Sequence, residues 1–449
     1  MIIIIPVKKN HEYTVEIETL SSEGSGIARV EGYTLFVAGA LAGDTARVLC
    51  TKLNKNYGFA RLVKLISPSP VRTSPECATF SDCGGCQLMH MSYEGQLEFK
   101  RQTVRDALKR IGGISLEPDI IGMETPFRYR NKMVFPIGKG GSWGFYRERS
   151  HEVICLKDCL LGDSLNHEIM NTVSEHIKKY NISVYNELEH MGSIRRVFIR
   201  SSRDEFMVVI SANADDIPHK NELIKSITAI SPKITSIILN VNKKRTNLVL
   251  GDKNITLWGK DKLTDTLCGL DYEISPHSFF QVNPIQTEKL YSTAISFADI
   301  SNQDTVMDIY CGIGTISLTA AKHAKAVIGI EIVPQAIEDA KKNAALNGIE
   351  NAEFFCSAAE DIVPHLIEKK TTPDIVILDP PRKGSDEKTL SAIVSAKPKR
   401  IVYVSCNPAT LARDAKFLTE NGYIAVKATA VDMFPHTTHV ETVMLLIKE

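Results

Sequence analysis

The sequence predicts an α/β protein in which a doubly wound, mostly parallel sheet forms the C-terminal part, after a small β-barrel and a mixed α+β segment. From about residue 287, helical patterns alternate with short apolar strands, as expected for a parallel sheet covered by helices on both faces. Residues 11–64 contain short β-like runs between turn signals, which is typical of a small barrel. The length of 449 residues leaves room for about three domains.

Periodicity and turn residues place the individual elements. The C-terminal strands are expected over 305–309, 326–330, 374–378 and 400–404, and the helices over 287–298, 315–323, 334–347, 386–394 and 409–420. The N-terminal strands are expected over 13–17, 27–30, 33–37, 44–49 and 57–66, and middle strands over 196–200, 206–211, 236–240 and 247–250, with a helix near 163–179. Ser92 is a predicted N-cap of a helix that ends at Gly112 and Gly113. We expect domains at 4–65, 66–265 and 266–449, the helix over 93–112 being a candidate to pack on the last.

Composition excludes several classes of protein. The chain has 53 Lys+Arg and 53 Asp+Glu and is 43% hydrophobic, which excludes a disordered or collagenous protein and a polybasic coat. Ten cysteines are too few for a disulfide scaffold, and the apolar run at residues 2–5 is too short for a secretory leader. Without a stretch long enough to cross a membrane, we expect a cytoplasmic protein with reduced thiols and no membrane partner, and a monomer without an obligate protein partner.

Charge is nevertheless uneven along the chain. Residues 97–150 hold eleven Lys/Arg, Arg149 among them, against six acids. The aromatic residues Phe127, Tyr129, Trp143 and Phe145 lie among these cations, a mixture that suits base stacking and phosphate contact. This basic segment is either a solvated helix face or part of a nucleic-acid-binding surface.

A glycine-containing turn follows the first strand of the predicted parallel sheet. In residues 308–315 (DIYCGIGT), Gly312 and Gly314 let the backbone approach a ligand, and Glu331 ends the next strand, where a carboxylate can bind ribose hydroxyls. A dinucleotide site calls for a third glycine where Ser317 stands. The pattern therefore favours an adenosyl ligand without pyrophosphate, S-adenosylmethionine, over a nicotinamide cofactor or a purely structural turn.

Three further candidates lie at strand ends on the same edge. Asp379 opens a rigid DPPR turn after strand 374–378, and Cys406 follows strand 400–404, a position that suits a nucleophile. Glu441 lies at the start of a strand that continues through residues 443–447, which adds a carboxylate to this edge. A buried free thiol and a solvated terminal carboxylate are the competing structural interpretations.

Five strings together resemble the bacterial RNA uracil-5-methyltransferases: residues 278–283 (SFFQVN), 308–315, 379–384 (DPPRKG), 405–408 (SCNP) and 439–441 (HVE). The N-terminal barrel resembles the TRAM domain, an OB-like RNA-binding module, so the resemblance covers essentially the whole chain. It implies a Rossmann-like methyltransferase domain, S-adenosylmethionine as cofactor, and a product that is 5-methyluridine.

The resemblance also implies roles for individual residues. Cys406 would add to carbon 6 of uracil, and Glu441 would remove the hydrogen of carbon 5 after methylation. Nucleophilic attack needs the thiolate, hence a thiol pKa below the usual value of about 8.5. The cofactor or the uracil would be contacted by Gln281, Tyr310, Gly312, Thr315, Glu331 and Asp379. At the positions of Thr315 and Ala358, some relatives have amide side chains that contact the cofactor.

Three cysteines close together predict a metal centre. Cys77, Cys83 and Cys86 fall within ten residues, and either Cys155 or Cys159 can supply a fourth thiolate. Four thiolates suit zinc and iron–sulfur clusters alike. The family resemblance implies a [4Fe-4S] cluster with Cys159 as the fourth ligand, and with no open ligand position we expect a structural role.

The substrate predicted by the resemblance is large-subunit (23S) ribosomal RNA, with one or two target uridines. Residues 129–132 (YRNK) resemble a family segment that would line the RNA path. The alternative is transfer RNA, against which the barrel and the cysteines argue, because transfer-RNA members of this family generally lack both. A radical S-adenosylmethionine enzyme requires a C-x3-C-x2-C spacing that the chain lacks, and a non-catalytic RNA-binding module leaves Cys406 and Glu441 unexplained.

Overall fold

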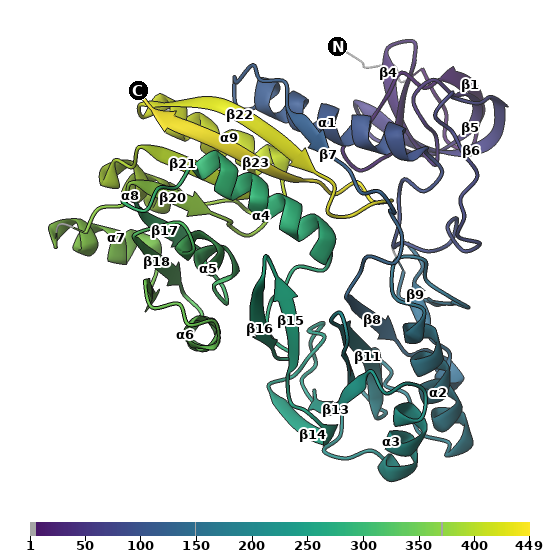
Figure 1. Ribbon diagram of the computed structural model, residues 1–449. Helices are drawn as coiled ribbons and strands as arrows, with labels where there is room; N and C mark the ends of the chain where they lie inside the picture. The colour runs from purple at the N-terminus through teal and green to yellow at the C-terminus, as the bar shows by residue number, and fades with distance from the viewer. Residues whose placement is uncertain (1–5, 149, 370) are drawn as a thin grey trace.

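The computed structural model describes residues 6–148, 150–369 and 371–449. Residues 2–5, the predicted apolar run, and Arg149 of the basic segment lie outside the described residues. Figure 1 shows three regions: a barrel-like sheet near the N-terminus, a central region below it, and a large sheet that contains the C-terminus. No helix in the described ranges is long and apolar enough to cross a membrane.

The N-terminal region is a six-stranded sheet that wraps around its own core (Figure 1). Its strands are β1 (Glu12–Glu16), β2 (Thr19–Leu20), β3 (Gly26–Val30), β4 (Tyr33–Ala38), β5 (Thr45–Leu53) and β6 (Tyr57–Ser67), in the order β1-β5-β6-β4-β3-β2. Alternate residues such as Leu35 and Val37 are fully buried, because successive side chains of a strand point to opposite faces. The predicted strands therefore lie where the sequence placed them.

The central region is a five-stranded sheet with helices on one face. It contains β8 (Lys132–Pro136), η1 (Lys139–Gly141), the hairpin of β9 (Gly144–Tyr146) and β10 (Val153–Cys155), α2 (Leu165–Lys179), β11 (Ile194–Ser201), β12 (Phe206–Ala212), α3 (Lys220–Thr228), β13 (Ile234–Val241) and β14 (Lys253–Gly259). The sheet order is β14-β13-β12-β11-β8. The strand predicted over 247–250 is wrong, since the strand of that region begins at Lys253.

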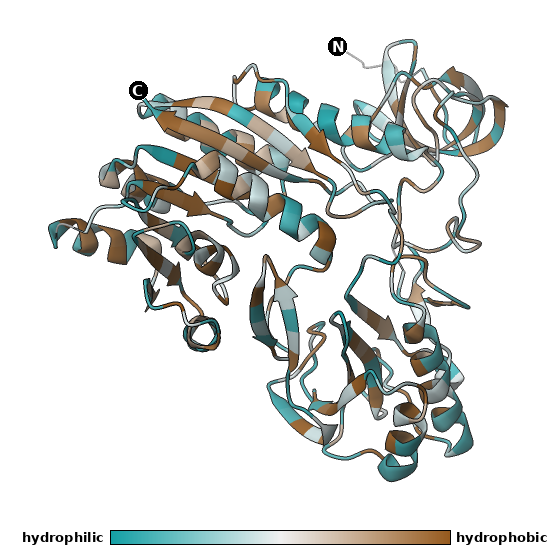
Figure 2. Cartoon of the chain, in the orientation of Figure 1, coloured by the Kyte–Doolittle hydropathy of each residue, from teal (hydrophilic) through white to brown (hydrophobic). Residues whose placement is uncertain are grey.

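The C-terminal region is an eight-stranded sheet, preceded by the hairpin β15 (Leu263–Leu267) and β16 (Leu270–Ile274). Its elements are α4 (Pro284–Ala298), β17 (Thr305–Ile309), α5 (Thr315–Ala321), β18 (Ala326–Glu331), α6 (Pro334–Leu346), β19 (Ala352–Cys356), α7 (Ala359–Glu368), β20 (Ile375–Leu378), α8 (Glu387–Ala396), β21 (Arg400–Ser405), α9 (Pro408–Glu420), β22 (Tyr423–Val431) and β23 (Glu441–Lys448). Strands β17 to β21 are parallel, and β23 is antiparallel to its neighbours. The central strands are mostly apolar (Figure 2), as expected for a sheet buried on both faces.

Two elements from before the central region belong to this large sheet. Helix α1 (Tyr93–Arg110) begins at Ser92, whose side chain accepts a hydrogen bond from the Gly95 N–H, and it buries Val104 and Leu108 in the core beneath the sheet. Strand β7 (Asp119–Ile121) extends the sheet beyond β22, giving the order β19-β18-β17-β20-β21-β23-β22-β7. The large sheet and the core beneath it thus include residues from before the central region (Figure 1).

Candidate functional site at the carboxyl edge of the large sheet

The carboxyl ends of four neighbouring parallel strands bring the predicted site residues to one edge. Ile309 lies in register with Ile330 on one side and with Leu378 on the other, and Leu378 lies in register with Tyr403. The residues that follow these strands, among them Tyr310 and Asp379, therefore lie along a common rim. A ligand that binds an open α/β sheet contacts this edge.

The glycine turn of the rim is open to a ligand. Gly312 and Gly314 have φ values of 55° and 84°, and a Cβ added to Gly312 would meet no atom within 4 Å. Tyr310 also has a positive φ, 68°, a costly conformation for a non-glycine residue that is found mainly at functional sites. The backbone N–H groups of Tyr310 and Cys311 hold the turn by donating to the Ile330 carbonyl, at 2.9 and 3.1 Å.

Beneath this turn lies the buried carboxylate of Asp308, the acid that opens the predicted motif over residues 308–315. Asp308 is fully buried, and its Oδ2 accepts a 2.5 Å hydrogen bond from the Ser317 hydroxyl, whereas Oδ1 has no partner among the described residues. Burial raises the pKa of this carboxyl to about 7, against the lowering effect of the Ser317 hydrogen bond. An unsatisfied buried acceptor below an open glycine turn fits a bound polar or cationic ligand.

Glu331 fixes the next corner of the rim. Its Oε1 accepts from the N–H groups of Ile332 and Val333, and its Oε2 accepts from the N–H of Gly312 at 3.3 Å. The side chain is half-buried and links the ends of β17 and β18. The predicted position of Glu331 at the end of the second strand is correct, and its carboxylate faces the glycine turn.

Cys406 and Glu441 approach each other through the register of β21 and β23. Ser405 pairs with Thr442 at the end of this antiparallel ladder, and the next residue along β21's direction, Cys406, is close enough to Glu441 for the two to interact electrostatically. Glu441 is 4% exposed, and Cys406 is half-buried. The alternative of a solvated terminal carboxylate is therefore wrong for Glu441.

The electrostatics of this pair oppose ionisation of the free protein. Burial, followed by the negative charges of Glu441 and Asp379, raises the pKa of the Cys406 thiol to about 11, while Arg382 acts in the opposite direction. Burial and Asp379 also raise the pKa of Glu441, again opposed by Arg382, and burial raises that of Asp379. The thiol is thus not preset as a thiolate. Arg382, which belongs to the predicted DPPR turn but to which sequence reasoning gave no role, is a cation next to this acidic rim.

Gln281 and Thr315 have different surroundings. Gln281 is buried, and its carbonyl accepts a 3.0 Å hydrogen bond from Asn131 Nδ2, which ties residues 278–283 to the central region. The Thr315 hydroxyl lies 2.9 Å from the Tyr291 hydroxyl, within the core side of α5. The hydroxyl groups of Thr315 and Tyr291 are therefore hydrogen-bonded to each other.

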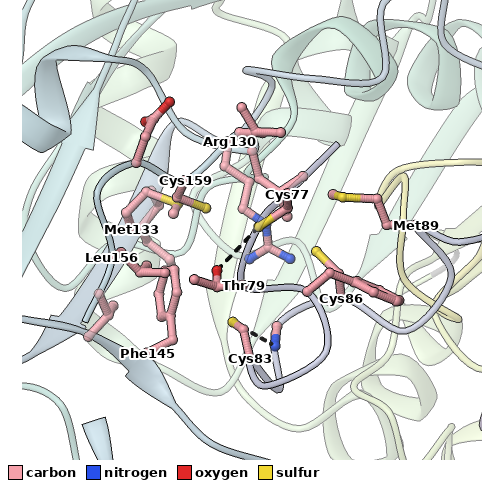
Figure 3. A pocket seen from close by; sticks show the side chains of 17 residues that line it. Cys77, Thr79, Cys83, Cys86, Met89, Arg130, Met133, Phe145, Leu156 and Cys159 are labelled. Atoms are coloured by element: carbon pink, nitrogen blue, oxygen red, sulfur yellow. Dashed lines mark hydrogen bonds between the residues drawn. The ribbon is translucent and has the colours of Figure 1, made fainter. Parts of the chain in front are cut away.

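A second group of predicted residues lies around one cavity in the central region. Cys77, Cys83, Cys86 and Cys159 line a cavity of 310 Å³, and Figure 3 shows their side chains around it together with Arg130. Burial, followed by the three other thiols, raises the pKa of Cys86 to about 12, against the lowering effect of Arg130. Cys77 contacts the Thr79 hydroxyl at 3.3 Å, and the Gly85 N–H donates to Cys83.

The other candidate ligand, Cys155, is exposed in strand β10 and is not part of the cavity lining. Within the described ranges, no group of three or more His, Cys, Asp or Glu side chains is arranged to hold a metal ion. The four thiols surround one cavity and have the donor chemistry of an iron–sulfur or zinc site, so they fit such a group in residue type, although their arrangement does not form a metal-binding group.

The basic segment is more structural than its composition indicated. Lys100 is fully buried in an ion pair with Asp432, and Arg128 and Arg147 pair with Asp158 and with Asp82 and Glu152. Tyr129 and Trp143 are core residues, 4% and 5% exposed. Much of the cation–aromatic mixture therefore stabilises the fold, which leaves a smaller part of it for contact with nucleic acid.

Strand order and the glycine turn define the class of protein: this is the fold of S-adenosylmethionine-dependent methyltransferases. The family model described as tRNA (Uracil-5-)-methyltransferase matches residues 218–449, and that of the TRAM domain matches residues 6–63. The chain belongs to the RNA uracil-5-methyltransferase family and uses S-adenosylmethionine.

Relatives agree over the full length. A protein of Clostridium tetani named "Uncharacterized RNA methyltransferase" is 47% identical, with 98% of this chain and 97% of that protein covered. A Listeria innocua protein also named as an uncharacterized RNA methyltransferase is 46% identical, with 98% of each chain covered. The crystal structure of Pyrococcus abyssi tRNA (uracil-54, C5)-methyltransferase with S-adenosyl-L-homocysteine has a TM-score of 0.78 at 29% identity, covering 97% of this chain and 100% of that one.

Proposed function

We propose that the chain transfers a methyl group from S-adenosylmethionine to carbon 5 of a uridine in 23S ribosomal RNA, with Cys406 as covalent nucleophile and Glu441 as base. The observation that supports the catalytic assignment is that the end of the β21–β23 ladder brings the Cys406 thiol near the carboxylates of Glu441 and Asp379. A thiol and a carboxylate next to each other are the two groups that this substitution requires.

The residues act in order on the pyrimidine ring. The Cys406 sulfur bonds to carbon 6, and the electrons of the ring double bond move onto the neighbouring carbonyl, so that carbon 5 becomes nucleophilic. S-adenosylmethionine, when bound, supplies the electrophilic methyl group that carbon 5 accepts. Glu441 then takes the hydrogen of carbon 5 as a proton, the carbon 6–sulfur bond breaks, and Cys406 is restored as the double bond re-forms.

The cofactor would be held by the glycine turn and the acids around it. Gly312 leaves room for close approach, Glu331 lies at the end of β18, and the unpartnered Oδ1 of Asp308 lies beneath the turn. Tyr310, which belongs to the same turn, and Gln281 would also contact the cofactor or the uracil. Buried carboxylates also favour a cationic ligand, and the methyl donor carries a positively charged sulfur.

We propose further that Cys77, Cys83, Cys86 and Cys159 hold a [4Fe-4S] cluster. The four side chains line one cavity, whereas Cys155 points elsewhere in the fold. An iron–sulfur cluster in this place would bind the loop over residues 77–86 to the segment that precedes α2, and so brace the central region. All four ligand positions are protein thiolates, which fits a structural role.

Two classes of RNA compete as substrate. The similarity of the motifs to the ribosomal-RNA members, together with four thiols around one cavity, supports 23S ribosomal RNA in the cytoplasm. The likeness to the archaeal transfer-RNA enzyme favours transfer RNA as the second candidate. The structural similarity to that enzyme extends over 97% of this chain. The presence of a barrel therefore does not argue against transfer RNA as substrate.

The experiment is trapping with 5-fluorouridine-containing RNA, which leaves no removable hydrogen at carbon 5. Purified protein is mixed with S-adenosylmethionine and either 23S ribosomal or transfer-RNA transcripts, and crosslinked nucleotides are mapped. We expect a Cys406-dependent crosslink to 23S RNA, and a Glu441→Gln protein that accumulates the same kind of adduct on ordinary RNA. Methylation by Cys406→Ala would overturn the covalent scheme, and crosslinking to transfer RNA alone would replace the substrate.

A further inference from the structure

The loop over residues 432–440, which joins β22 to β23, ends at the proposed base Glu441. Strands β22 and β23 pair up to Val431 and Glu441, so the loop is closed at its base by this pair. A displacement of the loop would therefore also displace Glu441, the residue that begins β23.

The loop is held almost entirely by groups from other parts of the chain. Successive backbone groups from Asp432 to His436 bond to six outside residues: Ile121, Gln286, Asn283, Lys100, Tyr129 and Gln96. Their distances lie between 2.9 and 3.1 Å. The carbonyl of His436 accepts two further bonds from the N–H groups of Gln87 and Leu88, just after Cys86.

The centre of this network is a buried ion pair from α1. Lys100 Nζ donates to Asp432 Oδ1 at 2.5 Å and to the Phe434 carbonyl at 3.0 Å, and both charged side chains are fully buried. The Tyr93 hydroxyl donates to the other oxygen of Asp432 at 2.9 Å. A buried pair in which both carboxylate oxygens and the ammonium group have hydrogen-bond partners fixes geometry more strongly than it adds stability.

Strain within the loop indicates that the network imposes its shape. His436 has φ = 68°, and its ring stacks on Phe127 with centroids 4.6 Å apart. Such a backbone persists only where surrounding contacts over-determine it. The loop is thus held in one conformation by residues that do not reach the reaction centre.

We propose that Lys100, through its pair with Asp432, is a positioning residue for proton removal by Glu441. The inference rests on the proposed function, since it assigns Lys100 to the step that follows methyl transfer. Displacing Glu441 leaves the thiol, the cofactor turn and RNA contacts in place, so adduct formation continues while its resolution slows.

The test compares Lys100→Met and Tyr93→Phe with Leu108→Ala, a control on the same helix whose side chain is buried in the core beneath the sheet. Single-turnover reactions with labelled methyl donor are resolved on denaturing gels into free RNA and protein-bound methylated RNA. We expect release to slow by between about tenfold and about a hundredfold in Lys100→Met, with methyl transfer nearly unchanged. Tyr93→Phe should show a smaller effect of the same kind.

The outcomes separate the two proposals. Suppose that Glu441→Gln accumulates adduct. If Lys100→Met does not accumulate it, and its melting temperature shows that the variant is folded, then Lys100 has no positioning role. If Leu108→Ala accumulates adduct as well, loss of stability alone explains the effect and the inference is overturned. If even Glu441→Gln gives no adduct while wild-type protein methylates, the covalent scheme itself fails.

Discussion

The Cys406 thiol follows the last pair of the β21–β23 ladder, Ser405 with Thr442, and lies near enough to the buried carboxylate of Glu441 for the two groups to interact electrostatically. Because β23 is antiparallel to both β21 and β22, it begins at the carboxyl edge, where those two strands end. This reversal brings a residue near the C-terminus beside the end of an internal parallel strand. The proposed nucleophile and base thus lie at adjacent ends of two hydrogen-bonded strands.

We expect methylation to speed up as the pH rises through the neutral range. The reactive forms of Cys406 and Glu441 are both deprotonated, and both pKa values are raised, that of the thiol to about 11, so their population grows with pH. Single-turnover rates between pH 6 and pH 9.5, measured at saturating RNA, would test this. A flat profile in that window would contradict it.

Arg382→Gln should shift the rise of the methylation rate to higher pH. Arg382 lowers the pKa of both Cys406 and Glu441, so its removal raises both and slows the reaction most at low pH. Lys383→Gln removes the adjacent exposed cation of the same turn and serves as the matched control. An equal displacement in the two variants would mean that the general field of the turn, rather than Arg382, acts on the pair.

Gly312→Ala should weaken cofactor binding. The φ of 55° makes any side chain unfavourable by about 1 kcal/mol, and its methyl group would enter the open space over the turn. Gly348→Ala, with φ = 63° and equally open surroundings at the end of α6, has the same backbone cost far from the rim. Calorimetric titration with S-adenosylhomocysteine should show a loss for Gly312→Ala only; equal losses would remove the glycine turn from the cofactor site.

Cys159→Ser should abolish the iron–sulfur chromophore, and Cys155→Ser should leave it intact. Only Cys159 lines the cavity with the three cysteines of the 77–86 loop, while Cys155 is exposed in β10. Protein purified without oxygen is assayed for iron, sulfide and visible absorbance. Iron retained by Cys159→Ser but lost by Cys155→Ser would reverse the ligand assignment, and zinc in place of iron would refute the cluster.

Much of the large sheet was predictable because strands buried on both faces appear as short, uninterrupted apolar runs. Residues 305–309 were predicted as a strand, and β17 has these bounds. The prediction failed at 247–250, where Val249 and Leu250 pack against a core without joining the sheet. There the Asn242 side-chain amide donates to the Leu248 carbonyl and the Ser211 hydroxyl donates to the Val249 carbonyl, a use of polar groups that periodicity does not reveal.

The site was predictable in position and not in its electrostatics. Motifs at strand ends located Cys406, Asp379 and Glu331, since parallel strands deliver their carboxyl ends to one edge. The raised pKa of the thiol depends on burial and on charges that come from distant parts of the chain. In the same way, Lys100 appeared as one cation of a basic segment, and its pairing with Asp432 arises only when α1 docks on the sheet.

Strand β7 and helix α1 give the chain an order of assembly that differs from its order of synthesis. Both precede the central region in sequence, yet β7 pairs with β22 and α1 packs against α9, near the other end of the chain. Helix α1 emerges from the ribosome hundreds of residues before α9, its packing partner, is synthesised. A fusion protein that contains only the residues from 266 onward would therefore leave β22 with an unpaired edge. A functional fusion must also contain residues 93–121.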